Sequence, residues 1–553
     1  MKRRVTLCLC FLILLGCLLF ACVTQAKREL PTTEGVLSAL YEADISTLRQ
    51  AIDSGLISCE DLTAYYLERI EAYNAPYNCF ITLCTDALDV ARKRDEQRAA
   101  GEGKGLLFGI PVVIKDNMDL TGYHTTNGLK FNDDQIAKAN ATVVDYLLSE
   151  GAVILGKTNM STRAQDARAS VSQVAGETKN AYGTLLASGG SSGGTAVAVS
   201  LNFAAAGLGS DTNSSLRLPA VLNGCVSMRT TFGLIPTDGI KPLNTTRDVA
   251  GAITRSVYDQ AIMLDVLTQG KYQYTANLQG DSLQGLRIGI LTNLTEPQSG
   301  SRTEKNIDDE IIAAFHAAAE VLRSCGAEVF EVKFPNMFTL SNATLDTNAD
   351  SKKDAFYKAF EEMMTKNDLD AVIFPTYLNA PLKSGTDENG KTWNPNSQVF
   401  ITNTRALSPS ARLPEIGIPI GYHSRGAGIG MDIAARMGEE QLLLNIAYTY
   451  EQHASPRKVP GGAPNTYADK AAGTLTELIE LHLSDHPLLP PPVTETPPVE
   501  TPDPIPQPLP EDPPARGYNL AIDTSERILP LAFCCGIVLF PLKKLFRKIK
   551  KSS

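Results

Sequence analysis

The chain is poor in positive charge. It has 51 Lys and Arg residues against 61 Asp and Glu residues, which gives a net charge of −10 and an isoelectric point near 5.3. Nucleic-acid binding draws on clustered Lys and Arg that neutralise phosphates. We therefore expect no nucleic-acid-binding surface.

Cysteine is scarce outside the two ends. Of 11 cysteines, six lie in the terminal apolar runs and five in the body, at positions 59, 79, 84, 225 and 325. The five are odd in number and include no C-x-x-C spacing, so neither a zinc site nor a disulfide framework is indicated. We predict no metal and no cofactor, although Cys79 and Cys84 could pair.

Histidine is also rare, with six residues in 553. The run Gly189 to Gly193 matches the G-x-S-x-G nucleophile elbow, which needs an apolar strand before it and a histidine base. Residues 184–188 make a poor strand, and none of the six histidines stands out as a base. A Ser-His-Asp site is therefore disfavoured, while plain glycine–serine turns leading into a helix at 195–206 remain an alternative.

The chain has ample apolar material, with 43% hydrophobic and 20% charged residues. That composition supports a large core. Helical patterns occupy much of 46–100 and the segments 141–150, 309–325 and 440–452, and strand-like runs lie at 106–114, 152–155, 286–291, 328–332 and 369–375. Strands alternating with helices predict an α/β layer fold.

The N-terminus resembles a secretory signal. Basic residues at 2–4 precede an apolar run at 5–23, so residues 1–26 are predicted to be a signal peptide or an N-terminal anchor. Cys17 and Cys22 lie in lipobox-like contexts and Ala26 ends an ordinary cleavage site, and the choice among these stays open.

The C-terminus carries a second apolar run at 528–542, followed by a basic tail at 543–553. We predict a single-pass transmembrane anchor with a cytoplasmic tail, although the run is short against the ~20 residues that span a bilayer and a buried or interfacial helix is the alternative. The proline-rich segment 487–514 is predicted to be an extended linker. Basic flanks at both ends place everything between them outside, at the extracellular face of the membrane, as on a bacterial cell surface.

Four motifs in order carry the chemistry: GIPVVIKDN at 109–117, GKTNM at 156–160, GGSSGG at 189–194 and GSDTNSSLRLPA at 209–220. Ser191 follows Lys115 by 76 residues, and Ser215 follows Ser191 by 24. In motifs and spacing the chain resembles the amidase signature family over roughly residues 40–480, and a domain at 35–485 is expected. The resemblance implies an amidase-signature fold, a large mixed β-sheet sandwiched between α-helices.

The resemblance also implies a Ser-Ser-Lys triad. Ser215 would be the nucleophile, Ser191 a bridging serine held by a cis peptide bond, and Lys115 the general base. An unperturbed lysine with a pKa of ~10.4 costs about 4.6 kcal/mol to deprotonate at pH 7, so the base must be desolvated. Taken alone, a lysine at the end of a strand could equally reach solvent or pair with Asp116.

The family's oxyanion hole consists of backbone N–H groups, which here belong to Thr212, Asn213, Ser214 and Ser215. The family usually has two glycines where this chain has Asn213 and Ser214, which puts the geometry of the hole in question. Supporting roles fall to Ser192, Asp211 and Arg217, with a turn hydroxyl and a salt bridge as the alternative.

The sequence thus predicts an extracellular, membrane-anchored amidase that hydrolyses a small-molecule or peptide amide through an acyl-serine intermediate. Export argues against the role of the glutamine amidotransferases within this family. A catalytically impaired binding protein of the same fold and an esterase with the same triad are the alternatives. The loop 376–410, which holds the single Trp393, is expected near the substrate entrance.

Overall fold

The computed structural model describes residues 32–485, apart from 131–135, 299, 301, 348, 455–456 and 471–472. The predicted signal or anchor at 1–26, the linker at 487–514, the anchor at 528–542 and the tail at 543–553 lie outside the described residues. Among the helices that are described, none is both long and apolar enough to cross a membrane.

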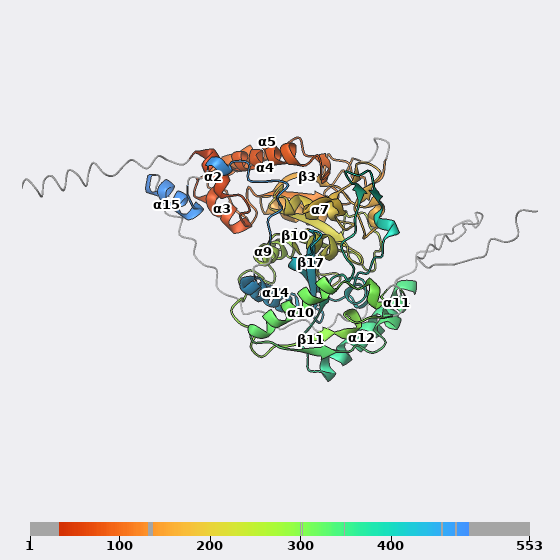
Figure 1. Cartoon of the computed structure of the whole chain (residues 1–553). Helices are drawn as coiled ribbons and strands as arrows, with labels where there is room; N and C mark the ends of the chain where they lie inside the picture. The colour runs from red at the N-terminus through yellow and green to blue at the C-terminus, as the bar shows by residue number, and fades with distance from the viewer. Residues whose placement is uncertain are drawn as a thin grey trace, which may run out of the picture. The chain divides into compact units, whose positions relative to one another are not determined.

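One sheet of 11 strands organises the described chain, in the order β1-β3-β2-β8-β10-β9-β16-β17-β13-β11-β12. Figure 1 shows β3, β10, β17 and β11 following one another in that order. The strands are β1 (Phe80–Leu83), β2 (Pro111–Lys115), β3 (Val153–Thr158), β8 (Ala206–Asp211), β9 (Val226–Arg229), β10 (Val249–Thr254), β11 (Arg287–Leu291), β12 (Glu328–Val332), β13 (Ala371–Pro375), β16 (Glu415–Tyr422) and β17 (Gly428–Ala434).

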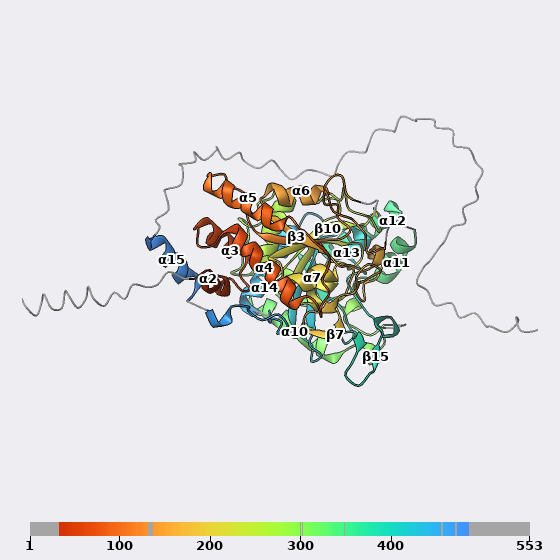
Figure 2. The same ribbon diagram turned by 90° about the horizontal axis from the view of Figure 1, so that it is seen from above.

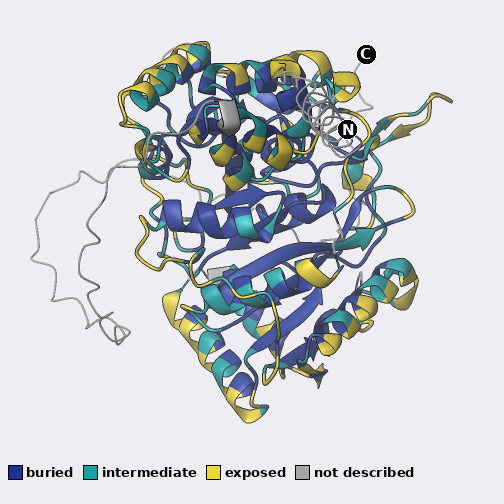
Figure 3. Ribbon diagram, turned by 90° about the vertical axis from the view of Figure 1, so that its left-hand side faces the viewer, coloured by how far each residue is buried: buried dark blue, intermediate teal, exposed yellow. Residues whose placement is uncertain are grey.

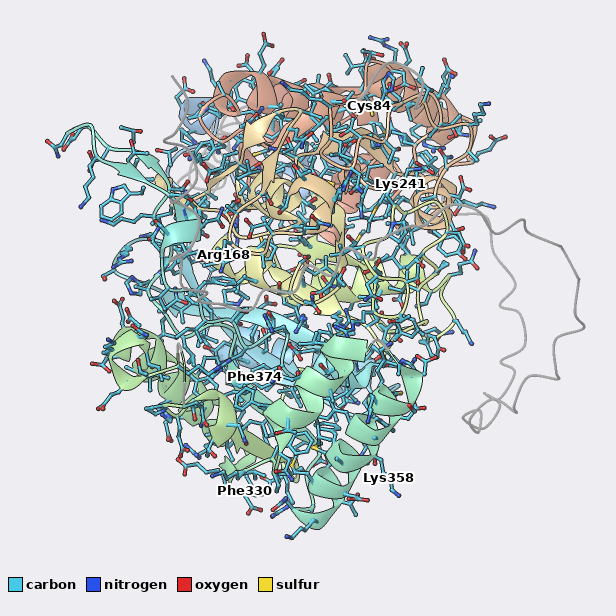
Figure 4. All side chains as sticks on the ribbon, turned by 90° about the vertical axis from the view of Figure 1, so that its right-hand side faces the viewer. Cys84, Arg168, Lys241, Phe330, Lys358 and Phe374 are labelled. Atoms are coloured by element: carbon cyan, nitrogen blue, oxygen red, sulfur yellow. The ribbon has the colours of Figure 1, made fainter. Side chains whose placement is uncertain are left out.

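The sheet is mixed. β2 is parallel to both β3 and β8, and β11 is parallel to both β12 and β13, whereas the strands from β8 through β17 to β13 pair antiparallel. Figure 4 labels Phe374 on β13 and Phe330 on β12, the two neighbours of β11. Outside the sheet lie three small pairs: β4 (Val171–Ser172) with β5 (Gly176–Glu177), β6 (Lys179–Asn180) with β7 (Gly183–Ala187), and β14 (Gly385–Thr386) with β15 (Thr392–Trp393).

Helices cover both faces of the sheet. Ile253 of β10 packs with residues of α7 and α8, whereas the adjacent Ala252 shares a core cluster with Met263 of α9. Successive strand residues point to opposite faces. Figure 3 shows the buried strands lying between helices whose outer sides are exposed. The predicted mixed sheet between helices is therefore confirmed.

The described helices are α2 (Thr33–Ala39), α3 (Ile45–Asp53), α4 (Cys59–Tyr73), α5 (Ala87–Ala99), α6 (Thr142–Ser149), α7 (Gly193–Ser200), α8 (Arg217–Leu222), α9 (Val257–Leu267), α10 (Asp309–Ser324), α11 (Met337–Thr347), α12 (Asp350–Lys366), α13 (Ser408–Ala411), α14 (Glu440–Ala454) and α15 (Leu475–Asp485). Figure 2 shows α15 beside α2, so the two ends of the described chain meet. Ser58 caps α4 by accepting a hydrogen bond from the Asp61 N–H at 2.9 Å.

Two predicted elements differ in length. The strand predicted at 106–114 begins only at Pro111, because residues 106–109 form turns and Gly109 has a φ of +74°. The helix predicted at 195–206 ends at Ser200, and Ala206 already belongs to β8. A buried arginine accommodates this break: Arg69 donates to the carbonyls of Leu201 and Asn202 at 3.0 Å each.

Two further expectations are corrected. Residues 183–187, read from the sequence as a poor strand, form β7, although β7 pairs with β6 and not with the large sheet. Cys79 and Cys84 do not pair, and all five cysteines of the body are free and buried. Burial raises the pKa of the Cys79 thiol well above its usual value, which leaves it a small apolar side chain.

Candidate active site

The site gathers where β2 and β8 end. These neighbouring parallel strands carry Lys115 and Asp211 as their last residues. The loop 212–216 leads from β8 to α8, and the GGSSGG turn leads from β7 to α7. Carboxyl ends of parallel strands are where α/β folds bind ligands.

Lys115 is completely buried. Its Nζ lies 2.7 Å from Ser191 Oγ, 3.0 Å from Ser210 Oγ and 3.4 Å from the Ser210 carbonyl oxygen. It neither reaches solvent nor pairs with Asp116, whose carboxylate lies 3.1 Å from Lys157 Nζ instead. Both alternatives that the sequence left open for this lysine are wrong.

Burial lowers the pKa of Lys115 to about 7, against the opposing influence of the Asp211 and Asp248 carboxylates. A desolvated ammonium is costly, whereas the neutral amine is not. A substantial fraction of the lysine is therefore an uncharged base at neutral pH.

Ser191 lies in a tightly packed turn. The Gly190–Ser191 peptide bond is cis, as the resemblance implies. A Cβ on Gly190 would lie 2.4 Å from the Asp166 carbonyl oxygen, and one on Gly194 would lie 2.3 Å from that of Asn159. The glycines of this motif are thus required by close approach of other backbone.

Ser170, which the sequence did not single out, fastens the same turn. Its hydroxyl lies 3.2 Å from the Ser191 carbonyl oxygen and 3.1 Å from that of Gly189. The Gly193 N–H donates to the same hydroxyl at 2.8 Å. Ser170 therefore fixes the backbone on both sides of Ser191.

Ser215 is joined to this turn through the backbone. The Ser192 N–H donates to the Ser215 carbonyl at 3.3 Å, and 6% of Ser215 is exposed. Within the described chain, no direct hydrogen bond joins the hydroxyls of Ser191 and Ser215. The Ser192 hydroxyl contacts the backbone of Ser210, at 3.3 Å from its oxygen and 3.4 Å from its nitrogen, and not the lysine.

The loop 212–215 forms without glycine. Neither Asn213 nor Ser214 appears among the described residues with positive φ, so the substitution of both family glycines imposes no left-handed strain. The Thr212 hydroxyl donates to Asp248, and the Asn213 carbonyl accepts from Arg217 at 3.1 Å. The loop is thus held from both sides.

A buried charge network lies beneath this loop. Asp211 Oδ2 accepts from the Leu216 N–H and from Arg217 Nε, both at 3.1 Å. Burial alone would raise the pKa of Asp211, but Arg217 and Arg229 hold it below its usual value. Arg217 also binds Glu415 of β16, so it ties the loop to the centre of the sheet.

A further acid of this network, Asp432 of β17, lies 3.7 Å from Arg217 Nη1. Burial raises its pKa to about 7, despite the nearby guanidinium. Asp211 and Arg217 therefore act as a brace for the loop, and the salt bridge that the sequence offered as an alternative to direct catalysis is present.

Comparison with known proteins decides the family. A family model described as Amidase matches residues 61–350 and 338–444. The chain belongs to the amidase family.

Relatives agree with this membership. The A chain of the glutamyl-tRNA(Gln) amidotransferase of Thermoanaerobacter pseudethanolicus is 30% identical, over 76% of this chain and 99% of its own length. The native peptide amidase of Stenotrophomonas maltophilia is 27% identical with a TM-score of 0.64, and the match covers 76% of this chain and 99% of that one. The corresponding amidotransferase chain of Thermotoga maritima shares the fold, with 22% identity and a TM-score of 0.60 over 73% of this chain and 94% of that one. As an amidase-family member, the chain is an enzyme that acts on carbon–nitrogen bonds.

Sequence reasoning missed several contacts of this amidase site. Ser210 and Asn117 stand inside two of the quoted motifs, but only their three-dimensional placement brings them to Lys115. Asp248 and Glu415 lie on segments that no motif of the triad contains. A search for polar residues next to the motif lysine would have found Asn117 alone.

Two cavities adjoin the site. One of about 110 Å³ is lined by Asn117, Ser210, Thr212 and Asp248, among others. A smaller slot lies between Leu218 and Leu222 of α8 and the side chains of Tyr377 and Phe400. Arg168, labelled in Figure 4, also lines this slot. Part of the loop 376–410 therefore lies against the helix that follows Ser215.

One group in the described chain has the composition of a metal site, formed by Asp308, Glu310 and His423. His423 Nδ1 accepts the Arg425 N–H at 2.9 Å, which leaves Nε2 protonated and donating to Asp308 at 3.2 Å. Asp308 also caps α10. These hydrogen bonds explain the group as structural and do not fit a metal at Nε2.

Proposed function

We propose that this chain hydrolyses a carboxamide through an acyl-serine intermediate, with Ser215 as nucleophile, Ser191 as proton relay and Lys115 as general base. The observation that carries the proposal is the buried 2.7 Å contact between Lys115 Nζ and Ser191 Oγ. A lysine held largely neutral can accept a proton at physiological pH.

In the first half of the reaction, Lys115 takes the proton of Ser191, and Ser191 takes that of Ser215. The Ser215 oxygen attacks the amide carbon and forms a tetrahedral intermediate. The backbone N–H groups of residues 212–215 would stabilise its oxyanion, each donor contributing about 3–4 kcal/mol in the transition state. The protonated lysine returns its proton through Ser191 to the departing nitrogen. Ammonia or an amine leaves, and an ester on Ser215 remains.

In the second half, water attacks the acyl-enzyme by the same route. It gives up one proton toward Ser191 and Lys115, and the Ser215 oxygen recovers a proton when the carboxylic acid is released. The Asp211–Arg217 brace keeps the loop 212–215 in place through both halves.

For substrate, we propose a small-molecule or peptide carboxamide. The similarity to a peptide amidase supports this class. The apolar slot beside α8, with Tyr377 and Phe400, suits an apolar group next to the scissile amide. A charged tRNA partner is disfavoured by the net charge of −10.

For location, we propose the extracellular face of a membrane, with residues 528–542 as anchor and 1–26 as signal or anchor. The support is the sequence pattern of apolar runs with basic flanks. Protease treatment of intact cells should release residues 35–485 into the medium. Full protection of that region, in cells whose other surface proteins are cleaved, would refute the placement.

The catalytic proposal is tested with a fluorophosphonate, which reacts with activated serines. We expect one adduct, mapped by mass spectrometry to Ser215, in the wild-type protein and none in Ser215→Ala. Absence of the adduct from a folded wild-type sample would favour a binding protein of the same fold.

A further inference from the structure

Ser210 is the second hydroxyl at Lys115, and the triad gives it no task. We propose that Ser210, oriented by Asn117, is a positioning residue that directs the lone pair of Lys115 toward Ser191. The inference rests on the function proposed above, because it assumes that Lys115 is the base.

A count of hydrogen bonds supports this role. A neutral lysine amine has two N–H donors and one lone pair, whereas the ammonium has three donors. Lys115 Nζ has three neighbours: Ser191 Oγ at 2.7 Å, Ser210 Oγ at 3.0 Å and the Ser210 carbonyl at 3.4 Å. If Ser210 accepts both N–H groups, the remaining position of the amine is a lone pair that faces Ser191. All three neighbours accept when the lysine is protonated.

The arrangement works only if the Ser210 hydroxyl accepts and does not donate to the lysine. A donating hydroxyl would occupy the lone pair and compete with Ser191 for it. Asn117 addresses this competition, since its Nδ2 donates to Ser210 Oγ at 3.0 Å. Asn117 and Lys115 then take the two acceptor positions of that oxygen, and the Ser210 proton must point elsewhere, where the 110 Å³ cavity adjoins it.

The orientation of the Asn117 amide follows from its own contacts. Nδ2 also points to the Lys241 carbonyl oxygen at 3.5 Å, and 1% of Asn117 is exposed. The opposite orientation would place Oδ1 against that carbonyl, two acceptors facing each other without a proton. The fold therefore presents the donor end of Asn117 to Ser210.

Charges around Lys115 set how readily it is protonated, but not where its lone pair points. They are Asp211 at the end of β8 and Asp248 before β10, with the Asp116–Lys157 pair next along β2 and β3. Arg217 and Arg229 neutralise part of the Asp211 charge. Direction, in contrast, depends on the uncharged pair Ser210 and Asn117.

The test is the rate of fluorophosphonate labelling of Ser215 in the full chain, followed between about pH 5 and pH 9, where an active base of neutral pKa titrates. Four variants are compared with wild type: Ser210→Ala, Asn117→Ala, the double variant and Ser192→Ala. The last is the matched control, since it removes a hydroxyl that bonds to the Ser210 backbone but not to Lys115.

In Ser210→Ala we expect the plateau rate to fall about 10-fold. The acid limb should move to lower pH by about one pH unit, because the ammonium loses an acceptor. Asn117→Ala should lower the plateau less. The double variant should resemble Ser210→Ala, since Asn117 acts through Ser210. Ser192→Ala should leave the limb in place.

An acid limb unmoved in Ser210→Ala, or losses that multiply in the double variant, would overturn the positioning role. A wild-type protein that is not labelled at Ser215 at any pH would overturn the proposed function and this inference together. Labelled wild type with an unmoved limb in Ser210→Ala overturns this inference alone.

Discussion

Lys115 Nζ lies 2.7 Å from Ser191 Oγ, and neither residue has any exposed surface. The contact joins the end of β2 to the cis peptide turn before α7. Because burial lowers the pKa of Lys115 to about 7, the pair can exchange a proton near neutrality. This contact and the groups that hold it determine how the protein should respond to mutation and to pH.

Removal of the base should abolish most of the reaction. In Lys115→Met, a replacement of similar length without the amine, we expect labelling of Ser215 to slow by about 10²–10⁴-fold. The matched control is Lys358→Met on α12, an exposed lysine labelled in Figure 4, which should react like wild type. A folded Lys115→Met variant that reacts at the wild-type rate would remove the lysine from the mechanism.

The pH dependence should report the same lysine. Activity should rise through about pH 7 as Lys115 loses its proton. Asp248 favours the ammonium, so Asp248→Asn should lower the pKa of Lys115 and shift the rise to lower pH, by up to about one pH unit. Asp145→Asn, at an exposed position on α6, should not shift it. A shift to higher pH in Asp248→Asn would contradict the assignment.

The same lysine should affect stability. Its pKa is lower in the folded state than in the unfolded state, so between about pH 7 and pH 10 the unfolded chain binds more protons. Stability relative to Lys115→Met should therefore rise with pH through this window, in urea unfolding at several pH values. A relative stability that falls with pH would mean that the lysine is not desolvated.

The brace under the loop should matter for both stability and reactivity. Arg217→Met leaves Asp211 and Glu415 buried without their shared partner, and loss of one partner of a buried ion pair costs about 3–5 kcal/mol. We expect a lower urea midpoint and slow labelling of Ser215. Arg287→Met, which breaks a partly exposed pair with Glu328, should shift the midpoint far less. Equal effects of the two changes would argue against the brace.

The loop 212–215 should not depend on glycine. Because φ at Asn213 and Ser214 lies outside the left-handed region, Asn213→Gly and Ser214→Gly should each leave the labelling rate within about threefold and cost roughly 0.5–1 kcal/mol in stability. A large gain in rate in either variant would show that the present side chains obstruct the oxyanion hole.

Much of the site could be predicted from sequence because its residues stand in local motifs. The placement of Lys115 at the end of a buried strand and the cis bond before Ser191 both agree with motif and resemblance. The φ angles of Asn213 and Ser214 could not be predicted, since a non-glycine residue leaves several conformations open. The Asn117–Ser210–Lys115 contacts and the role of Asp248 depend on which side chains meet across strands, which spacing does not reveal.

The fold followed a similar division. Strongly apolar runs predicted β3, β11 and β12 nearly at their observed bounds, because burial on both faces dictates such runs. The small-residue stretch after Ser192 was assigned wholly to a helix, whereas it holds both α7 and the start of β8. Its break is set by contacts with Arg69 from α4, more than a hundred residues away in the chain.

The most direct test of amide hydrolysis is ammonia release from a panel of peptide C-terminal amides and small carboxamides. Wild type is compared with Ser215→Ala, and acid-quenched samples are examined for an acyl group on Ser215. We predict ammonia release by wild type on at least one amide, an acyl adduct that maps to Ser215, and neither in Ser215→Ala. Equal ammonia release by the two proteins, or turnover without an adduct that depends on Ser215, would contradict the account.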